Sequence, residues 1–257
     1  MKIQILAHRG GMGRAPENTV ASFKQALADG ADGYEFDVCL TQDKQPVLIH
    51  VAFNRNDIRE ATGCSIPLSE LTWKEVQQLT MGTSDERVAH LDDALRFTRE
   101  HQMPCFIEPK TDVPEVLPII VERVRHFEVV HLTSILTFYL HKQLLVDAKR
   151  LEPRLQTSAI LINPFANFLK AATAIDVNRI IFGWSRINHF ALYNAVTRTV
   201  TRQVEQLRAN GIVVEAGFIQ TARDVAWAVS PQKSGGVDSL WVDDVPYIRS
   251  CLQEIQP

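Results

Sequence analysis

Short apolar runs alternate with longer segments of helical periodicity along almost the whole sequence. The runs have the length of strands and are rich in branched and aromatic residues, whereas the segments between them repeat apolar residues every three to four positions. The pattern predicts strands near residues 3–8, 33–40, 105–109, 132–136, 155–162, 179–184, 212–216 and 239–243. It predicts helices near 18–29, 91–101, 114–127, 137–150, 165–175, 199–210 and 221–230.

The first of these helices has clear signals at both ends. Asn18 is a suitable N-cap residue, and Gly30 supplies a stop. Between them Val20, Phe23 and Leu27 recur at helical spacing. We therefore expect Asn18 to start this helix.

Eight strands that alternate with helices over 257 residues predict an α/β fold, the (β/α)₈ TIM barrel. A doubly wound open sheet is the alternative, but no GxGxxG motif follows the first strand. With no repeat or linker in the sequence, residues 1–257 are expected to form a single catalytic barrel domain.

One interruption of the alternation follows the second strand. Residues 42–88 hold a further strand at 45–50, a polar stretch and a short helix, "LSELTWKEVQQL", which together are too long for a strand-to-helix loop. We expect an insertion at about 51–88, on the face where the second strand ends. Active sites of such barrels lie on that face.

The second strand, "GYEFDVCL", carries two acids. Glu35 and Asp37 alternate with Tyr34, Phe36 and Val38, so the acids share one face of the strand. Helices cover the outside of a barrel and attract the large apolar residues, which turns the acids inward. Because two unpaired buried carboxylates are costly, they need a partner such as a divalent cation.

The next barrel strand, "CFIEPK", repeats the pattern. Glu108 and Lys110 share a face at the end of this strand. Three carboxylates at neighbouring strand ends, Glu35, Asp37 and Glu108, form an oxygen-rich site that suits Mg²⁺ or Ca²⁺. We therefore expect one divalent cation there.

Two histidines are predicted at the same rim. His8 ends the first strand and His50 ends the strand at 45–50, which suggests a general acid and a general base. Arg9 and Lys110 are suited to a phosphate, and the glycines of "GGMG" offer backbone N–H groups to an anion.

Composition narrows the range of partners. The hydrophobic fraction is 46%, which is enough for a full core, and a net charge of −3 gives no electrostatic case for nucleic acid or an anionic membrane surface. The four cysteines lack zinc-like spacing, and neither a leader segment nor an apolar run of membrane-spanning length is found. A protein of the cytoplasm without a membrane span is expected; the sequence leaves the oligomeric state open.

The segment "AHRGGMGRAPENTVASFKQALADGADGYEFDVCLTQDKQPVLIH" resembles the N-terminal signature of the glycerophosphodiester phosphodiesterases. The resemblance covers about the first fifth of the chain closely, and later pieces such as "HLDDAL", "IEPK" and "GVDSLWVDD" are looser. It implies a metal-dependent hydrolase on a (β/α)₈ barrel of the phospholipase C-like type, in lipid and glycerol metabolism. The implied products are sn-glycerol 3-phosphate and an alcohol such as choline or ethanolamine.

Transferred by position, the resemblance gives the same site residues as the spacing. The metal ligands are Glu35, Asp37 and Glu108; the acid–base pair is His8 and His50; Arg9 and Lys110 bind the phosphate. Glu17 in "PENT" either anchors its loop or orients His8 or Arg9.

The sequence departs from the family pattern at two places. Val51 stands where an Asp usually follows the second histidine, and "VVEAGFIQ" replaces the usual end of the seventh strand. We expect Glu215 at the substrate-facing rim and Trp184 lining the pocket; both are predicted to bind substrate, although Trp184 is equally compatible with the core.

Two alternative functions stay open. One is a related phosphodiesterase that acts on lysophospholipids or sugar phosphodiesters. The other, which the departures at Val51 and "VVEAGFIQ" motivate, is a non-catalytic barrel that binds a phosphodiester. The presence of all five acid and histidine residues argues against the second.

Overall fold

Eight parallel strands close into a barrel in the computed structural model, which describes residues 2–11 and 13–255. The barrel closes because β1 pairs with both β2 and β10. Its strands are β1 (Gln4–Ala7), β2 (Gly33–Leu40), β5 (Cys105–Pro109), β6 (Thr133–Phe138), β7 (Gln156–Leu161), β8 (Arg179–Gly183), β9 (Val213–Gly217) and β10 (Ser239–Val242). The predicted (β/α)₈ fold and its eight strands are confirmed.

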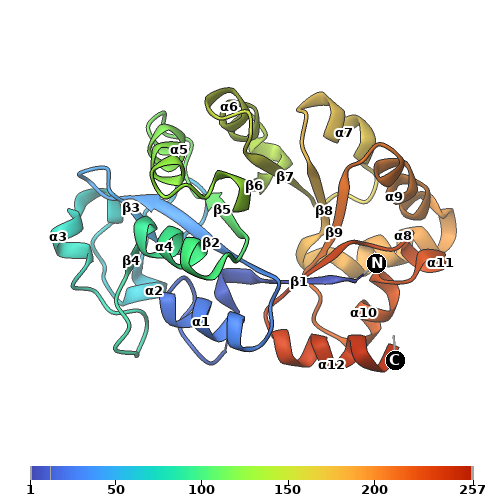
Figure 1. The fold of residues 1–257 in the computed structure, drawn as a ribbon, viewed down its shortest axis with the longest axis horizontal. Helices are drawn as coiled ribbons and strands as arrows, with labels where there is room; N and C mark the ends of the chain where they lie inside the picture. Colours follow the sequence, from blue (N-terminus) through green and yellow to red (C-terminus); the bar gives the residue numbers. More distant parts are fainter. Residues whose placement is uncertain (1, 12, 256–257) are drawn as a thin grey trace.

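Helices surround the strands on the outside of the barrel (Figure 1). They are α1 (Val20–Ala28), α4 (Leu91–His101), α5 (Val116–His126), α6 (Gln143–Leu151), α7 (Phe168–Ala174), α8 (Ile187–Thr197), α9 (Thr199–Ala209), α10 (Ala222–Ala228), α11 (Pro231–Ser234) and α12 (Val245–Ile255). Among the described residues, none of the helices has both the length and the apolar composition needed to cross a bilayer.

Sequence periodicity did not predict α8 and α12. Helix α8, "INHFALYNAVT", has apolar residues on both its inner and outer faces and so lacks the two-sided pattern of a surface helix. Helix α12 carries Pro246 in its first turn, where proline is tolerated because the N–H it lacks would have no helical partner.

The segment between β2 and α4 forms a small layer beside the barrel. It contains β3 (Pro46–Leu48), α2 (Arg59–Thr62), a 3₁₀ turn at Leu68–Glu70, α3 (Trp73–Val76) and β4 (Ala89–His90). Strand β3 pairs antiparallel with both β2 and β4. The helix expected over "LSELTWKEVQQL" is reduced to the 3₁₀ turn and α3, separated by Leu71 and Thr72.

The outer face of β2 explains the direction of its acids. Tyr34 lies 4.4 Å from Phe23 of α1 and 5.5 Å from Phe97 of α4, measured between ring centroids. Its hydroxyl donates to the backbone carbonyl of Ala94. Since successive side chains of a strand point to opposite faces, Glu35 and Asp37 face the barrel interior.

Candidate active site

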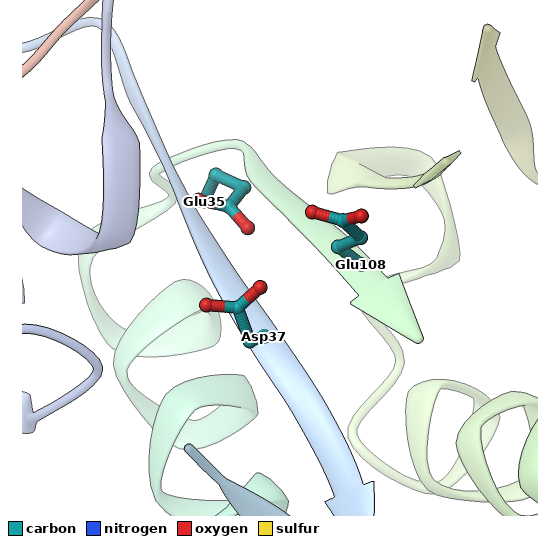
Figure 2. Close-up of side chains that lie close together, drawn as sticks. All are labelled: Glu35, Asp37 and Glu108. Carbon is teal, nitrogen blue, oxygen red and sulfur yellow. The ribbon is translucent and has the colours of Figure 1, made fainter. Parts of the chain in front are cut away.

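Three carboxylates converge inside the barrel near the ends of two adjacent strands (Figure 2). Glu35 and Asp37 come from β2, and Glu108 comes from β5, directly opposite Asp37 in the parallel register. One oxygen from each lies within 4.8 Å of the others, and all three side chains are buried. The structure thus brings together the three acids that the strand pattern singled out.

The acids perturb one another strongly. Burial, followed by the charges of Asp37 and Glu108, raises the pKa of Glu35 well above its usual value. Burial also raises the pKa of Glu108, to about 7, against the opposing effect of Lys110. Burial alone would raise the pKa of Asp37 too, but Lys110 and Arg9 outweigh it and lower the value. Burial and mutual repulsion therefore favour the protonated forms of Glu35 and Glu108 when no metal is bound, whereas Lys110 and Arg9 favour the ionised form of Asp37.

A divalent cation fits this donor set. Glu35 Oε1 and Asp37 Oδ1 are buried and accept no hydrogen bond from the described part of the chain. Clustered carboxylate oxygens are the ligands of Mg²⁺ and Ca²⁺, and a cation would satisfy both oxygens and relieve the repulsion. The acidic cluster is consistent with a divalent metal.

Asn18 fixes the position of Asp37. Its side-chain amide donates to Asp37 Oδ2 over 3.0 Å, and its Oδ1 accepts from the Asp37 backbone N–H over 2.9 Å. Asn18 is fully buried and has a positive φ of 60°, so it lies outside the helix. The prediction that Asn18 caps α1 is wrong: Thr19 is the N-cap, and it accepts from the Ser22 backbone N–H.

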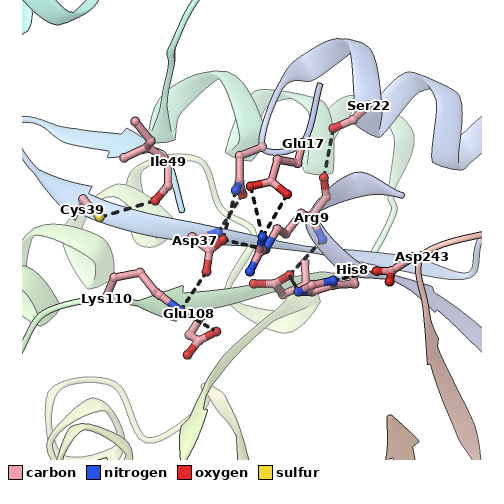
Figure 3. Close-up of polar contacts among 12 residues, drawn as sticks. His8, Arg9, Glu17, Ser22, Asp37, Cys39, Ile49, Glu108, Lys110 and Asp243 are labelled. Atoms are coloured by element: carbon pink, nitrogen blue, oxygen red, sulfur yellow. Dashed lines mark hydrogen bonds and ion pairs between the residues drawn. The ribbon is translucent and has the colours of Figure 1, made fainter. Parts of the chain in front are cut away.

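Two cations lie against the acids (Figure 3). Arg9 Nε is 3.2 Å from Asp37 Oδ2, while its Nη1 donates to both oxygens of Glu17. Lys110 Nζ is 3.3 Å from both Asp37 Oδ1 and Glu108 Oε2. Of the two readings of Glu17, its contact with Arg9 favours the orienting one.

His8 is held on two sides. Its Nδ1 lies 2.8 Å from Asp243 Oδ1, so this nitrogen carries the proton and Nε2 is turned toward Glu35 Oε2, 3.9 Å away. The ring packs against Phe218 at 4.1 Å and edge-on to Trp184 at 5.7 Å between centroids. Burial lowers the pKa of His8, although the hydrogen bond to Asp243 opposes it.

His50 follows β3 and lines a pocket of about 460 Å³ together with Arg9 and Glu17. Other residues of the segment between β3 and β4, among them Glu60 and Met81, also line this pocket. Burial lowers the pKa of His50 to about 4, so the ring is neutral at pH 7.

Val51, one of the two departures, is buried in an apolar cluster with Ile49 and Ile58. A valine at this position therefore supports the packing of the added segment and leaves His50 without a carboxylate as its next neighbour in sequence.

The second departure requires a correction. Glu215 is not at the rim: it is 0% exposed inside the barrel, where Arg179 Nη1 donates to its Oε1 over 2.6 Å and Trp241 Nε1 to its Oε2 over 2.9 Å. Arg179 begins β8, so this pair lies toward the end of the barrel away from the acidic cluster. Strand β9 continues past Glu215 to Gly217, and the aromatic side chain at its end is Phe218.

The structure also places two side chains beside His8 to which the sequence interpretation gave no role. Asp243 directly follows β10 and contacts His8, and Phe218 packs on the same histidine beside Trp184. A polar residue just after a barrel strand is a signal that would have selected Asp243. Trp184 is buried in an apolar cluster with Phe106 and Trp241, and its ring also contacts that of His8.

A (β/α)₈ barrel that gathers carboxylates, histidines and two cations at the C-terminal ends of its strands has the layout of a hydrolase for anionic substrates. The sequence matches the glycerophosphoryl diester phosphodiesterase family over residues 8–245, and the chain belongs to this family. The resemblance drawn from the N-terminal motifs is therefore confirmed.

Curated relatives carry the same family name. A glycerophosphodiester phosphodiesterase of Caldanaerobacter subterraneus is 24% identical over 257 residues, which cover 95% of each chain. Glycerophosphodiester phosphodiesterase 1 of mouse is 34% identical over 117 residues, which are 42% of this chain and 34% of that protein. The match thus spans only about a third of the mouse protein.

Solved structures share the fold. A phosphodiesterase of Oleispira antarctica, in complex with the product sn-glycerol 3-phosphate, superposes with a TM-score of 0.81 at 22% identity and covers 97% of this chain and 96% of its own. A glycerophosphodiester phosphodiesterase of Agrobacterium tumefaciens has a TM-score of 0.76 at 19% identity, with 97% and 100% covered.

Proposed function

We propose that this protein hydrolyses glycerophosphodiesters to sn-glycerol 3-phosphate and an alcohol, with one divalent cation, Mg²⁺ or Ca²⁺, held by Glu35, Asp37 and Glu108. The observation that carries the proposal is the convergence of three buried carboxylates within 4.8 Å beside His8 and Arg9. Membership of the family and the product complex of the Oleispira relative support the same reaction.

The cation would supply charge neutralisation at the phosphodiester and polarise its oxygens. Arg9 binds the phosphate next to it, since Glu17 and the acidic cluster hold its guanidinium at the pocket wall. Lys110 lies between Asp37 and Glu108 and adds a second positive charge for the developing negative charge.

The two histidines move the protons. Asp243 keeps the proton of His8 on Nδ1 and leaves Nε2 free on the side of the acidic cluster. His50 is neutral at pH 7 and faces the same pocket as Arg9. One histidine takes a proton from the attacking nucleophile, which is water or a neighbouring substrate hydroxyl, and the other, carrying a proton on both ring nitrogens before the step, protonates the departing alkoxide. Where the substrate hydroxyl attacks first, water then opens the resulting cyclic phosphate to give sn-glycerol 3-phosphate.

The rest of the chain shapes the site. Phe218 and Trp184 pack against the ring of His8, and the segment between β3 and β4 lines the pocket of Arg9 and His50 with Glu60 and Met81. We assign the whole chain to one catalytic unit of the cytoplasm, in which this segment at about 51–88 contacts the alcohol part of the substrate.

Release of glycerol 3-phosphate from glycerophosphocholine, with and without EDTA, tests the proposal. We expect turnover that depends on Mg²⁺ or Ca²⁺ and is lost in Glu35→Gln and His8→Asn. Glu122→Gln, an acid on the outer surface of α5, is the matched control and should retain full turnover. No metal-dependent release from any of a panel of glycerophosphodiesters would refute the proposed activity.

A further inference from the structure

Large apolar side chains gather on the outer surface beside α7 and α8. We call this surface the apolar ridge and define it by Ile162, Phe165, Leu192, Tyr193 and Val196. Phe165 is 73% exposed, Leu192 71% and Val196 83%. The ring of Tyr193 packs edge-on against that of Phe165, 4.8 Å between centroids, so the loop and the helix form one continuous surface.

One end of the apolar ridge lies at the face of the barrel that carries the acidic cluster, and the rest extends along α8. Ile162 and Phe165 belong to the loop after β7, and Leu192, Tyr193 and Val196 belong to α8, which follows β8 (Figure 1). Loops that follow parallel barrel strands share the face that carries the acidic cluster. A groove of about 820 Å³ runs along the ridge between the loop and the helix.

Helix α8 has an unusual composition for the outside of a barrel. Its inner face carries Ile187 and Phe190, as packing requires, but its outer face carries Leu192 and Val196 one turn apart. An outer helix normally turns polar residues to water. Exposed apolar groups that are contiguous rather than scattered mark an interaction surface.

Basic residues outnumber acids in the segment that carries the ridge. Residues 153–204 contain a single acid, Asp176, and it lies between α7 and β8, at the opposite end of the barrel. Arg186 and His189 line the groove, and Lys170 is exposed in the first turns of α7. Within the described residues neither Arg186 nor Lys170 forms an ion pair.

We propose that the apolar ridge is a docking surface for an anionic lipid bilayer. Phe165, Leu192 and Val196 enter the boundary between headgroups and acyl chains, while Arg186 and Lys170 meet the anionic headgroups. The whole-chain charge of −3 gives no attraction to such a surface, but screening over about 10 Å gives most weight to the charges closest to the lipid. The segment that carries the ridge, residues 153–204, has six basic residues and one acid.

A second copy of the chain is a poorer occupant. A two-fold interface centred on the ridge would bring the basic residues at its edge, Arg186 and Lys170, from both copies into the same contact. Like charges at such a contact oppose association, whereas anionic headgroups favour it. The bilayer satisfies both the apolar and the charged part of the surface.

Sedimentation of the full chain with lipid vesicles tests this surface. We expect binding to vesicles of phosphatidylcholine with phosphatidylglycerol, weaker binding to phosphatidylcholine alone, and release by added salt. Phe165→Ser/Leu192→Ser should lower the partition coefficient about tenfold. Its hydrolysis of glycerophosphocholine in solution should stay unchanged. The matched control is Leu151→Ser, a partly exposed apolar residue at the end of α6 that is not part of the ridge, and it should bind as the wild type does.

Two further measurements separate this surface from the active site and from self-association. Glu108→Gln should be inactive in the proposed reaction but should still bind vesicles. If it does not bind them, the vesicle contact involves the active site and the proposal is wrong. Light scattering after size exclusion should give the same mass for wild type and ridge variant. A dimer that the ridge variant dissociates would assign the ridge to a second copy, and absence of vesicle binding would also refute the proposal.

Discussion

Replacement of Asn18 tests whether a buried amide holds the metal-site carboxylate in place. In Asn18→Gly the backbone keeps its left-handed conformation, but Asp37 loses a hydrogen bond to its carboxylate and its own N–H loses its acceptor. A hydrogen bond to a charged group contributes about 1.5–3 kcal/mol, and a buried unsatisfied N–H costs about 1–3 kcal/mol. Because the two effects share one contact and do not add fully, we expect about 3 kcal/mol of destabilisation.

Asn18→Ala separates the backbone contribution from the side-chain contacts. It removes the same hydrogen bonds but keeps the Cβ that Asn18 already has at a φ of 60°, so it should be about 1 kcal/mol less stable than the glycine variant. Asn54 is the matched control, because it has a φ of 57° and its Oδ1 accepts from the Asp112 N–H, yet it is exposed. Asn54→Gly should cost less than about 1 kcal/mol.

The assay is urea unfolding of the metal-free protein in EDTA. The midpoint should fall with an unchanged slope, since the surface exposed on unfolding is the same. Titration of the folded variant with Mg²⁺ or Ca²⁺ should show affinity lowered about tenfold, as for other residues that orient a metal ligand. If Asn18→Gly unfolds at the same urea concentration as Asn54→Gly, Asn18 does not hold Asp37 and the reasoning fails.

Three further predictions concern the acids of the barrel. Mg²⁺ or Ca²⁺ should raise the thermal midpoint of the wild type and leave that of Glu108→Gln unchanged, because a cation that binds only the folded state stabilises it. Equal shifts of the midpoint in both proteins would contradict the assignment of Glu108 as a metal ligand. In the metal-free protein the pKa of Glu108 is raised to about 7. Its protonation therefore contributes stability that is complete below about pH 4.5 and is lost as the pH rises through 7, so the urea midpoint of the wild type should fall relative to that of Glu108→Gln over this range. A constant difference between the two midpoints would contradict the raised pKa. Glu215→Gln should lower the free energy of unfolding by about 2–4 kcal/mol, because Arg179 loses its buried counter-charge. The variant should keep the kcat/KM of the wild type for glycerophosphocholine. A large fall in kcat/KM would show that Glu215 acts on the substrate.

Local periodicity was enough to predict the strands and most of the helices. The alternation in β2 determined that Glu35 and Asp37 share one face, because side-chain direction along a strand depends only on the order of residues. It failed for α8, which carries apolar residues on both its inner and outer faces and so lacks an amphipathic pattern. Asn18 was misread because an amide is equally suited to cap a helix and to bind a buried carboxylate.

The acidic cluster was half determined by the sequence. The sequence determined that the three residues are acids and that each points into the barrel from its strand. Glu108 meets Asp37, however, only because β5 is the neighbour of β2 in the sheet. The intervening residues 41–104 leave the barrel and return, so their length alone does not specify this pairing.

Depth within the barrel was decided by the tertiary structure alone. The sequence determined that Glu215 points inward, yet its level depends on how β8, β9 and β10 are staggered, and the stagger places it against Arg179 and Trp241. The same closure brings Asp243 to His8 across 235 positions of sequence. Direction is a property of one strand, whereas depth and partners are properties of the closed barrel, and no single segment of the chain contains them.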